Sequence, residues 1–86
     1  MKFEFDPEKS EKNKAKHGVD FDQAQLLWGD PDAIGFPARS EDEERFALLA
    51  VIKGRLWVAF YTLRGDRIRL ISVRRARKGE KKLYES

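Results

Sequence analysis

The sequence contains no cysteine and only one histidine, His17. Without cysteine the chain can form neither a disulfide framework nor a thiolate metal site, and one histidine is too few for a histidine-based zinc site. We therefore expect no metal and no other cofactor. The sequence also lacks a signal peptide and any apolar run long enough to cross a membrane, so we expect a cytoplasmic protein without a membrane partner.

The 86 residues are too few for a second hydrophobic core and predict a single domain over residues 1–86. Their net charge of +3 conceals a segregated pattern. Between Asp20 and Glu44 eight acidic residues accompany one arginine, whereas between Lys53 and Lys82 eleven basic residues accompany two acidic ones. This asymmetry favours a polyanionic partner such as nucleic acid for the C-terminal half, with a solvated surface as the simpler alternative.

A basic hairpin near the C-terminus is the clearest structural motif. Two runs rich in β-branched and aromatic residues, Arg55–Leu63 and Arg67–Val73, flank Gly65-Asp66. A glycine at the first central position predicts a two-residue type II′ turn, which determines the register of the hairpin. The predicted opposed pairs are Arg64 with Arg67, Thr62 with Arg69, Phe60 with Ile71 and Val58 with Val73.

A third strand, Arg45–Ile52, precedes this hairpin and is joined to it through Lys53-Gly54. Lys-Gly is a weaker turn signal than Asn-Gly. If this turn also has two residues, Ile52 lies opposite Arg55 and the three strands form one antiparallel sheet.

This register places several arginines together on one face of the sheet. Arg45, Thr62 and Arg69 form a row across the three strands, and Arg64 and Arg67 lie one row nearer the second turn. Like charges side by side weaken a sheet. Their grouping therefore indicates a bound anion, an acidic partner or counter-charges nearby.

We predict three helices, from Pro7 to about His17, from Asp20 to Gly29 and from Lys78 to Tyr84, the last one short and weakened by Gly79. Asp6 provides the first N-cap, and Gly18 provides the left-handed residue that ends the first helix. The second helix begins with the spacing of a capping box. Because the first helix is almost entirely polar, we expect it at the rim of the fold.

Together these elements predict an α+β fold. We expect an antiparallel sheet of three main strands plus one or two short ones, which are Phe3–Phe5 and Ala33–Phe36. Two N-terminal helices should pack on its apolar face, and the short C-terminal helix should cover the apolar part of the other face through Leu83 and Tyr84.

Motifs along nearly the whole chain resemble those of a known family. The N-terminal motifs are Phe3-Glu4-Phe5-Asp6-Pro7-Glu8-Lys9, Asn13, Lys16-His17-Gly18-Val19 and Phe21. The later motifs are Glu44-Arg45, Gly54-Arg55, Tyr61-Thr62-Leu63-Arg64-Gly65-Asp66, Ile68-Arg69-Leu70-Ile71-Ser72, Arg74-Arg75-Ala76, Glu80 and Tyr84-Glu85. In this order they resemble the BrnT family of bacterial type II toxins, a group related in fold to RelE ribonucleases.

The resemblance implies a RelE-like fold and a toxin that cleaves mRNA as a metal-independent endoribonuclease. It also implies two partners, RNA and a BrnA-type antitoxin that neutralises the toxin. Such pairs typically repress their own operon through the DNA-binding part of the antitoxin.

Cleavage of RNA without a metal requires deprotonation of the 2′-hydroxyl, stabilisation of the phosphorane charge and protonation of the 5′-oxygen. Arginine suits the second task because its planar guanidinium forms bidentate bonds to phosphate. Proton transfer could belong to His17, Tyr61, Tyr84 or a carboxylate such as Glu44. The simpler role for His17 is to bond backbone carbonyls at a helix end, and Tyr61 is expected to face the core.

We predict that the catalytic residues are Arg45, Arg64, Arg69, His17 and Tyr84. The predicted RNA-binding residues are Arg67, Arg74, Arg75 and Lys78. Two other functions use the same basic face without catalysis: a nucleic-acid-binding module, and an interaction protein whose only partner is acidic.

Overall fold

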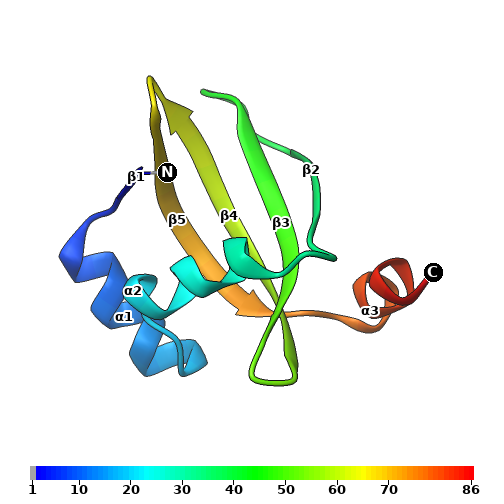
Figure 1. Cartoon of the computed structure of the whole chain (residues 1–86). Helices are drawn as coiled ribbons and strands as arrows, with labels where there is room; N and C mark the ends of the chain where they lie inside the picture. Colours follow the sequence, from blue (N-terminus) through cyan, green and yellow to red (C-terminus); the bar gives the residue numbers. More distant parts are fainter. Residues whose placement is uncertain (1) are drawn as a thin grey trace.

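The computed structural model describes residues 2–86 and contains a five-stranded sheet with helices (Figure 1). The α+β class is therefore confirmed. The elements are β1 (Lys2–Glu4), α1 (Pro7–His17), α2 (Phe21–Ala24), the 3-10 helix η1 (Gln25–Gly29), β2 (Ile34–Ala38), β3 (Arg45–Ile52), β4 (Arg55–Arg64), β5 (Arg67–Arg75) and α3 (Lys78–Glu85). None of the helices in residues 2–86 has the length and apolar character needed to cross a membrane.

The sheet is mixed, with strand order β1-β5-β4-β3-β2. The three expected strands form its centre, but the prediction of a purely antiparallel sheet is wrong. β1 pairs in parallel with β5, so that Glu4 lies beside Arg69. The reason is topological: the chain leaves β1 through its N-terminal helices and three further strands before β5 returns alongside it in the same direction. β2 adds the other edge by pairing antiparallel with β3.

Both predicted two-residue turns are present. Lys53 and Gly54 both have positive φ values, 49° and 79°, as a type I′ turn requires. Gly65 has a φ of 59° in the second turn, which fits the type II′ prediction. The predicted pairs of Ile52 with Arg55 and of Thr62 with Arg69 are confirmed.

The register of the second hairpin shifts between Phe60 and Tyr61. Phe60 pairs with Ser72 and Ala59 pairs with Val73, so the predicted Phe60–Ile71 and Val58–Val73 pairs are wrong. A bulge places one extra residue in one strand, and the residues of that strand beyond the bulge then point to the opposite face of the sheet. As a result Val73 becomes fully buried in the core.

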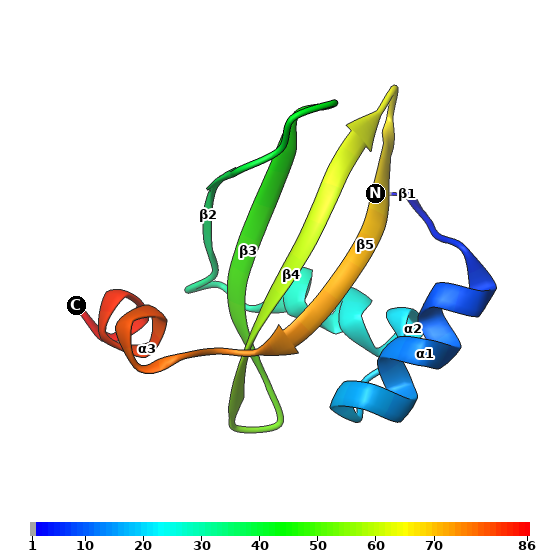
Figure 2. The same ribbon diagram turned by 180° about the vertical axis from the view of Figure 1, so that it is seen from behind.

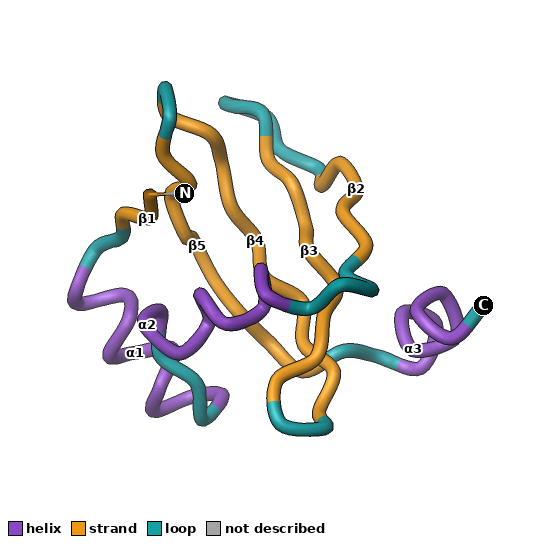
Figure 3. The backbone as a smooth tube through the Cα atoms, in the orientation of Figure 1, coloured by secondary structure: helices purple, strands orange, loops and turns teal. Residues whose placement is uncertain are grey.

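The helices α1, α2 and η1 cover one face of the sheet (Figures 1 and 3). The predicted single second helix is in fact a four-residue α-helix followed by a 3-10 turn. Its capping box is present, since the side chains and backbones of Asp20 and Gln23 bond reciprocally. The buried core on this face consists of Val19, Phe21, Ala24, Leu27, Leu48, Ala50, Trp57, Ala59, Leu70 and Val73.

The opposite face of the sheet is open except at one end, where α3 lies (Figure 2). Ala47, Leu49 and Val58 are fully buried on this face, and Tyr84 of α3 packs against their cluster. Leu83 is 47% exposed, so its predicted covering role is wrong. We call this surface the open face.

Candidate functional site

The predicted arginine row is present on the open face. Thr62 of β4 pairs with Arg69 of β5, and Arg45 directly precedes Phe46, whose partner is Tyr61. Arg45, Thr62 and Arg69 therefore lie side by side on three neighbouring strands. We call these three residues the arginine row.

Arg69 is held by a carboxylate from the parallel edge strand. Its Nη1 donates to Oε2 of Glu4 at 2.8 Å, and both side chains are partly buried. The sequence prediction did not include Glu4, although its position between Phe3 and Phe5 placed it on the opposite face from two core aromatics. The ion pair orients the guanidinium and leaves its other nitrogens for a ligand.

Arg45 is held much less firmly than Arg69. Its Nε lies 3.7 Å from Oε1 of Glu43, which is too long for a hydrogen bond. This Nε is buried and has no hydrogen-bond partner among the described residues. A buried donor without a partner is costly, which shows that the Arg45 side chain is not locked by an internal bond at this atom. The side chain is also 40% exposed, so its guanidinium is accessible to an anion.

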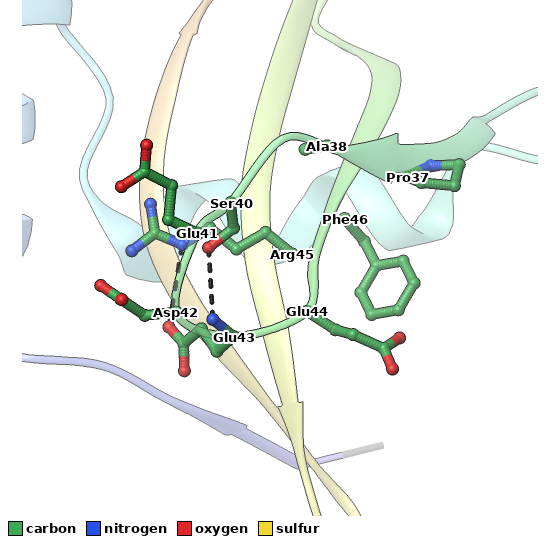
Figure 4. Close-up of a pocket in the computed structure, with 9 residues that line it drawn as sticks. All are labelled: Pro37, Ala38, Ser40, Glu41, Asp42, Glu43, Glu44, Arg45 and Phe46. Carbon is green, nitrogen blue, oxygen red and sulfur yellow. Dashed lines mark hydrogen bonds and ion pairs between the residues drawn. The ribbon is translucent and has the colours of Figure 1, made fainter.

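An acidic loop lies beside Arg45, between β2 and β3 (Figure 4). Residues 40–44 and the adjacent strand ends line a pocket of about 440 Å³. Ser40 accepts a hydrogen bond from the Glu43 amide at 3.4 Å within this loop.

Thr62, only 5% exposed, donates from its hydroxyl to the carbonyl of Glu44 at 2.7 Å. Thr62 therefore ties the loop to the sheet and acts as a spacer between the two arginines.

Arg64 and Arg67 are paired across the turn at the end of the open face, and both are exposed. The nearby Asp66 carboxylate lies 3.7 Å from the Lys2 ammonium, with both groups largely in water. The two arginines thus extend the positive charge beyond the arginine row, as predicted.

His17 lies away from the arginine row. It ends α1, which packs on the helix-covered face near Val73 through Asn13. The sheet therefore separates His17 from the open face. Val73 also lies four positions beyond Arg69 on β5, about 13 Å along the strand. The structure does not bring His17 to the predicted catalytic group.

Tyr84 is also distant from the arginine row. Its hydroxyl donates to Oδ2 of Asp30 at 2.6 Å, and the same oxygen accepts the Val51 amide at 2.9 Å. The bond to the carboxylate raises the pKa of Tyr84 to about 12 and lowers the pKa of Asp30. Val51 lies six positions from Arg45 on β3, about 20 Å along the strand. Tyr84 thus anchors α3 at the other end of the sheet.

Arg74 is occupied by an internal partner. Its two terminal nitrogens donate to both carboxylate oxygens of Glu80 at 2.8 and 2.9 Å, and its guanidinium lies over the Phe60 ring. This bidentate pair lowers the pKa of Glu80. In contrast, Arg75 and Lys78 are exposed at the start of the α3 region. Of these three predicted RNA-binding residues, Arg74 is the one that the fold neutralises.

Tyr61 lies in an aromatic group on the helix-covered side, in edge contact with Trp28 and stacked on Phe46. Burial raises the pKa of its hydroxyl. Its expected packing role is therefore supported by its surroundings. Within residues 2–86, no three His, Asp or Glu side chains cluster in a way that could hold a metal ion.

The open face thus presents two arginines that can approach one anion from both sides, with carboxylates at each end of the row. This arrangement suits the binding of a phosphate group. The chain matches the family model described as "Ribonuclease toxin, BrnT, of type II toxin-antitoxin system" over residues 5–80. The protein therefore belongs to the BrnT family of ribonuclease toxins. We find no match to the chain among curated proteins.

Proposed function

We propose that this protein is a metal-independent, RelE-like endoribonuclease that cleaves mRNA and is neutralised by a BrnA-type antitoxin. The observation that supports this most directly is the arginine row on the open face. Arg69 is oriented by Glu4, and Arg45 carries a buried Nε without a hydrogen-bond partner among residues 2–86. Two guanidinium groups in this arrangement can neutralise the charge that develops on a phosphorane.

Proton transfer in this proposal belongs to carboxylates rather than to His17 or Tyr84. Both of those residues lie too far from the arginine row to reach the same phosphate. Glu4 and Glu43 lie next to Arg69 and Arg45, at 2.8 and 3.7 Å. A carboxylate beside the bound phosphate can accept the proton of the 2′-hydroxyl as the 2′-oxygen bonds to phosphorus. The carboxylic acid formed in this way can then donate the proton to the 5′-oxygen as its bond to phosphorus breaks, which leaves a 2′,3′-cyclic phosphate and a 5′-hydroxyl.

The experiment is a cleavage assay with purified protein in the presence of EDTA. Arg45→Ala or Arg69→Ala should lower the rate about a hundredfold or more, because each removes a charge-assisted contact to the transition state. Arg69→Lys should restore only part of the rate, since lysine does not offer the bidentate fork. Lys12→Ala, which removes an exposed charge on α1, is the matched control and should cleave at the parent rate.

Three results would contradict the proposal. Loss of activity in EDTA would exclude a metal-independent reaction. Folded Arg45→Ala and Arg69→Ala variants with the parent rate would place the site elsewhere. RNA binding without cleavage by the parent protein would favour the non-catalytic nucleic-acid-binding module.

A further inference from the structure

A second group of cations surrounds a hollow at the far end of the sheet from the Gly65-Asp66 turn. Five exposed basic side chains line this pocket of about 260 Å³. We call it the basic pocket, and its cations are Arg55, Arg75, Arg77, Lys78 and Lys81. Figures 1 and 2 show this region where β5 leads into α3, close to the turn between β3 and β4.

Three segments of the chain converge to form the basic pocket. The amide of Ala76 donates to the carbonyl of Leu56 at 3.0 Å, which extends the pairing of β4 and β5 beyond the last residue of β5. This bond brings the segment 75–77 beside Arg55. Lys78 and Lys81 are added by the first turn of α3, where residues three apart lie on the same side of a helix.

The charge of the basic pocket is only partly offset within residues 2–86, where Glu80 attracts Arg77 through its charge without pairing with it. None of its five cations takes part in an ion pair within residues 2–86. The nearest helical carboxylate, Glu80, is already bonded to Arg74 and to the amide of Arg77. Arg75 rests on the Trp57 ring at 5.5 Å, a contact that positions the guanidinium without neutralising it.

This concentration of like charge destabilises the folded chain unless an anion offsets it. The first turn of α3 adds its free amides, which favour a negative group at the same place. Gly79 lies in this turn, carries no side chain and has nothing within 4 Å of the position that a Cβ would take, so no side chain crowds this side of the turn. A phosphate fits these donors better than a spread acidic surface because all of them converge on one hollow.

We propose that the basic pocket binds backbone phosphates of the RNA at a distance from the arginine row. This inference rests on the proposed function, which makes RNA the substrate. Arg75 lies six positions beyond Arg69 on β5, about 20 Å along the strand, and the bulge turns its side chain onto the Trp57 ring of the helix-covered face. Leu56 and Ala76 line the same pocket and belong to the cluster of the open face, so the basic pocket lies at the end of the sheet, where the two faces meet. A substrate strand that runs along the open face to the end of the sheet therefore contacts the arginine row first and the basic pocket beyond it, and a dinucleotide reaches only the row.

The test uses the whole protein and two ligands. One is a 2′-O-methyl oligoribonucleotide, which cannot be cleaved, and the other is a cleavable dinucleotide. The variant Arg55→Ala/Arg77→Ala/Lys81→Ala removes three charges of the basic pocket. The control Lys9→Ala/Lys12→Ala/Lys16→Ala removes three exposed charges of α1. Equal thermal stability of the two variants establishes that any difference is not due to misfolding.

We expect the pocket variant to bind the oligonucleotide at least about tenfold more weakly than the control variant. Its log–log salt slope should fall by about 0.7 for each phosphate that is no longer bound. Cleavage of the dinucleotide should remain at the parent rate. Arg55→Lys/Arg77→Lys should retain most of the affinity, because this site acts mainly through charge.

Equal oligonucleotide affinity and salt slope in the pocket and control variants would overturn the inference. Loss of the antitoxin complex with unchanged RNA affinity would also overturn it and would identify the pocket as a protein interface. If the parent protein binds the oligonucleotide but cleaves no RNA, the proposed function fails, whereas the binding comparison still decides the role of the pocket.

Discussion

Asn13 is the residue that joins the polar helix α1 to the sheet. Its Nδ2 donates to the carbonyls of Val19 and Val73 at 2.8 and 3.0 Å, and its Oδ1 accepts the Val73 amide at 3.0 Å. Ser10 adds a fourth bond by accepting the Phe21 amide at 2.9 Å. Helix α1 therefore depends on buried hydrogen bonds where most surface helices use an apolar stripe.

We predict that Asn13→Ala lowers the free energy of unfolding by about 3 kcal/mol, because it leaves buried backbone groups of Val19 and Val73 without partners. Urea denaturation measures this loss. The adjacent exposed Lys12→Ala is the control and should change stability by less than about 0.5 kcal/mol. An Asn13→Ala variant as stable as the control would show that these bonds contribute little.

At the scale of elements, the two hairpin turns determine which residues share a face. Gly65 adopts a φ of 59°, in the left-handed region that β-branched residues avoid. Nothing lies within 4 Å of a Cβ at this position, so backbone conformation alone restricts the residue.

Gly65→Val should lower stability by about 1–2 kcal/mol through strain at the turn. Gly65→Asn should cost much less, since asparagine tolerates this conformation. Thermal melting of the two variants provides the measurement. Equal melting temperatures for Gly65→Val and the parent protein would argue against the type II′ turn.

Helix α3 is attached mainly by polar contacts. It has no buried residue of its own, and it is held by the Arg74–Glu80 pair and by the bond from Tyr84 to Asp30. Both carboxyl groups have pKa values lowered by these partners. A group whose pKa is lowered by folding stabilises the fold above its unfolded pKa, and this contribution is lost as the pH falls through its folded pKa.

We therefore predict that Glu80→Gln is less stable than the parent protein near neutral pH, by about 1–2 kcal/mol. The difference should shrink as the pH falls below the ordinary pKa of Glu80, about 4.5, because the parent then also loses the charge. Denaturation at several pH values tests this expectation. A gap that stays constant into acid would show that the charge of Glu80 does not hold α3.

In the whole molecule, the two faces of the sheet have different roles, one in stabilising the fold and the other in presenting the candidate site. One face carries the main core and the helices α1, α2 and η1, whereas the other carries the arginine row and is open except where α3 lies. Because the family is that of a type II toxin, an antitoxin protein is implied as its partner. A basic open face is complementary to an acidic or polar antitoxin surface.

Expression of the protein alone should stop bacterial growth, and co-expression with the product of the adjacent gene should restore it. Colony counts and co-purification measure the two effects. Arg69→Ala should be much less toxic than the parent, whereas Lys12→Ala should remain toxic. A protein that is harmless alone and binds no product of a neighbouring gene would contradict the proposed toxin–antitoxin pair.

Features that depend on nearby residues can be predicted from the sequence. The cap at Asp6, the stop at Gly18 and both two-residue turns follow from the conformational preferences of single residues. These two turns also determine how the central strands pair near each turn and therefore predict the arginine row, because the register of a hairpin propagates from its turn. The family motifs depend on residue identity alone and were likewise readable without a structure.

Contacts between distant parts of the chain cannot be predicted from local sequence and are visible only in the folded structure. Glu4 and Arg69 are 65 positions apart, and Asp30 and Tyr84 are 54 positions apart. Such pairs follow from the parallel docking of β1 and from the position of α3, and neither has a local signal. For this reason the candidate site includes Glu4, which local sequence did not indicate, and excludes Tyr84, which had been predicted to belong to it.

The bulge near Phe60 illustrates the same limit within a hairpin. Strict alternation from Arg69 would place Val73 on the open face, but the bulge turns Val73 into the core beneath the helices. The bulge allows Val73 to be buried and allows its backbone to bond with Asn13. Asn13 lies on α1, 60 positions earlier in the chain. The local sequence pattern does not reveal this stabilisation of the bulge, because Asn13 and Val73 come into contact only when the chain has folded.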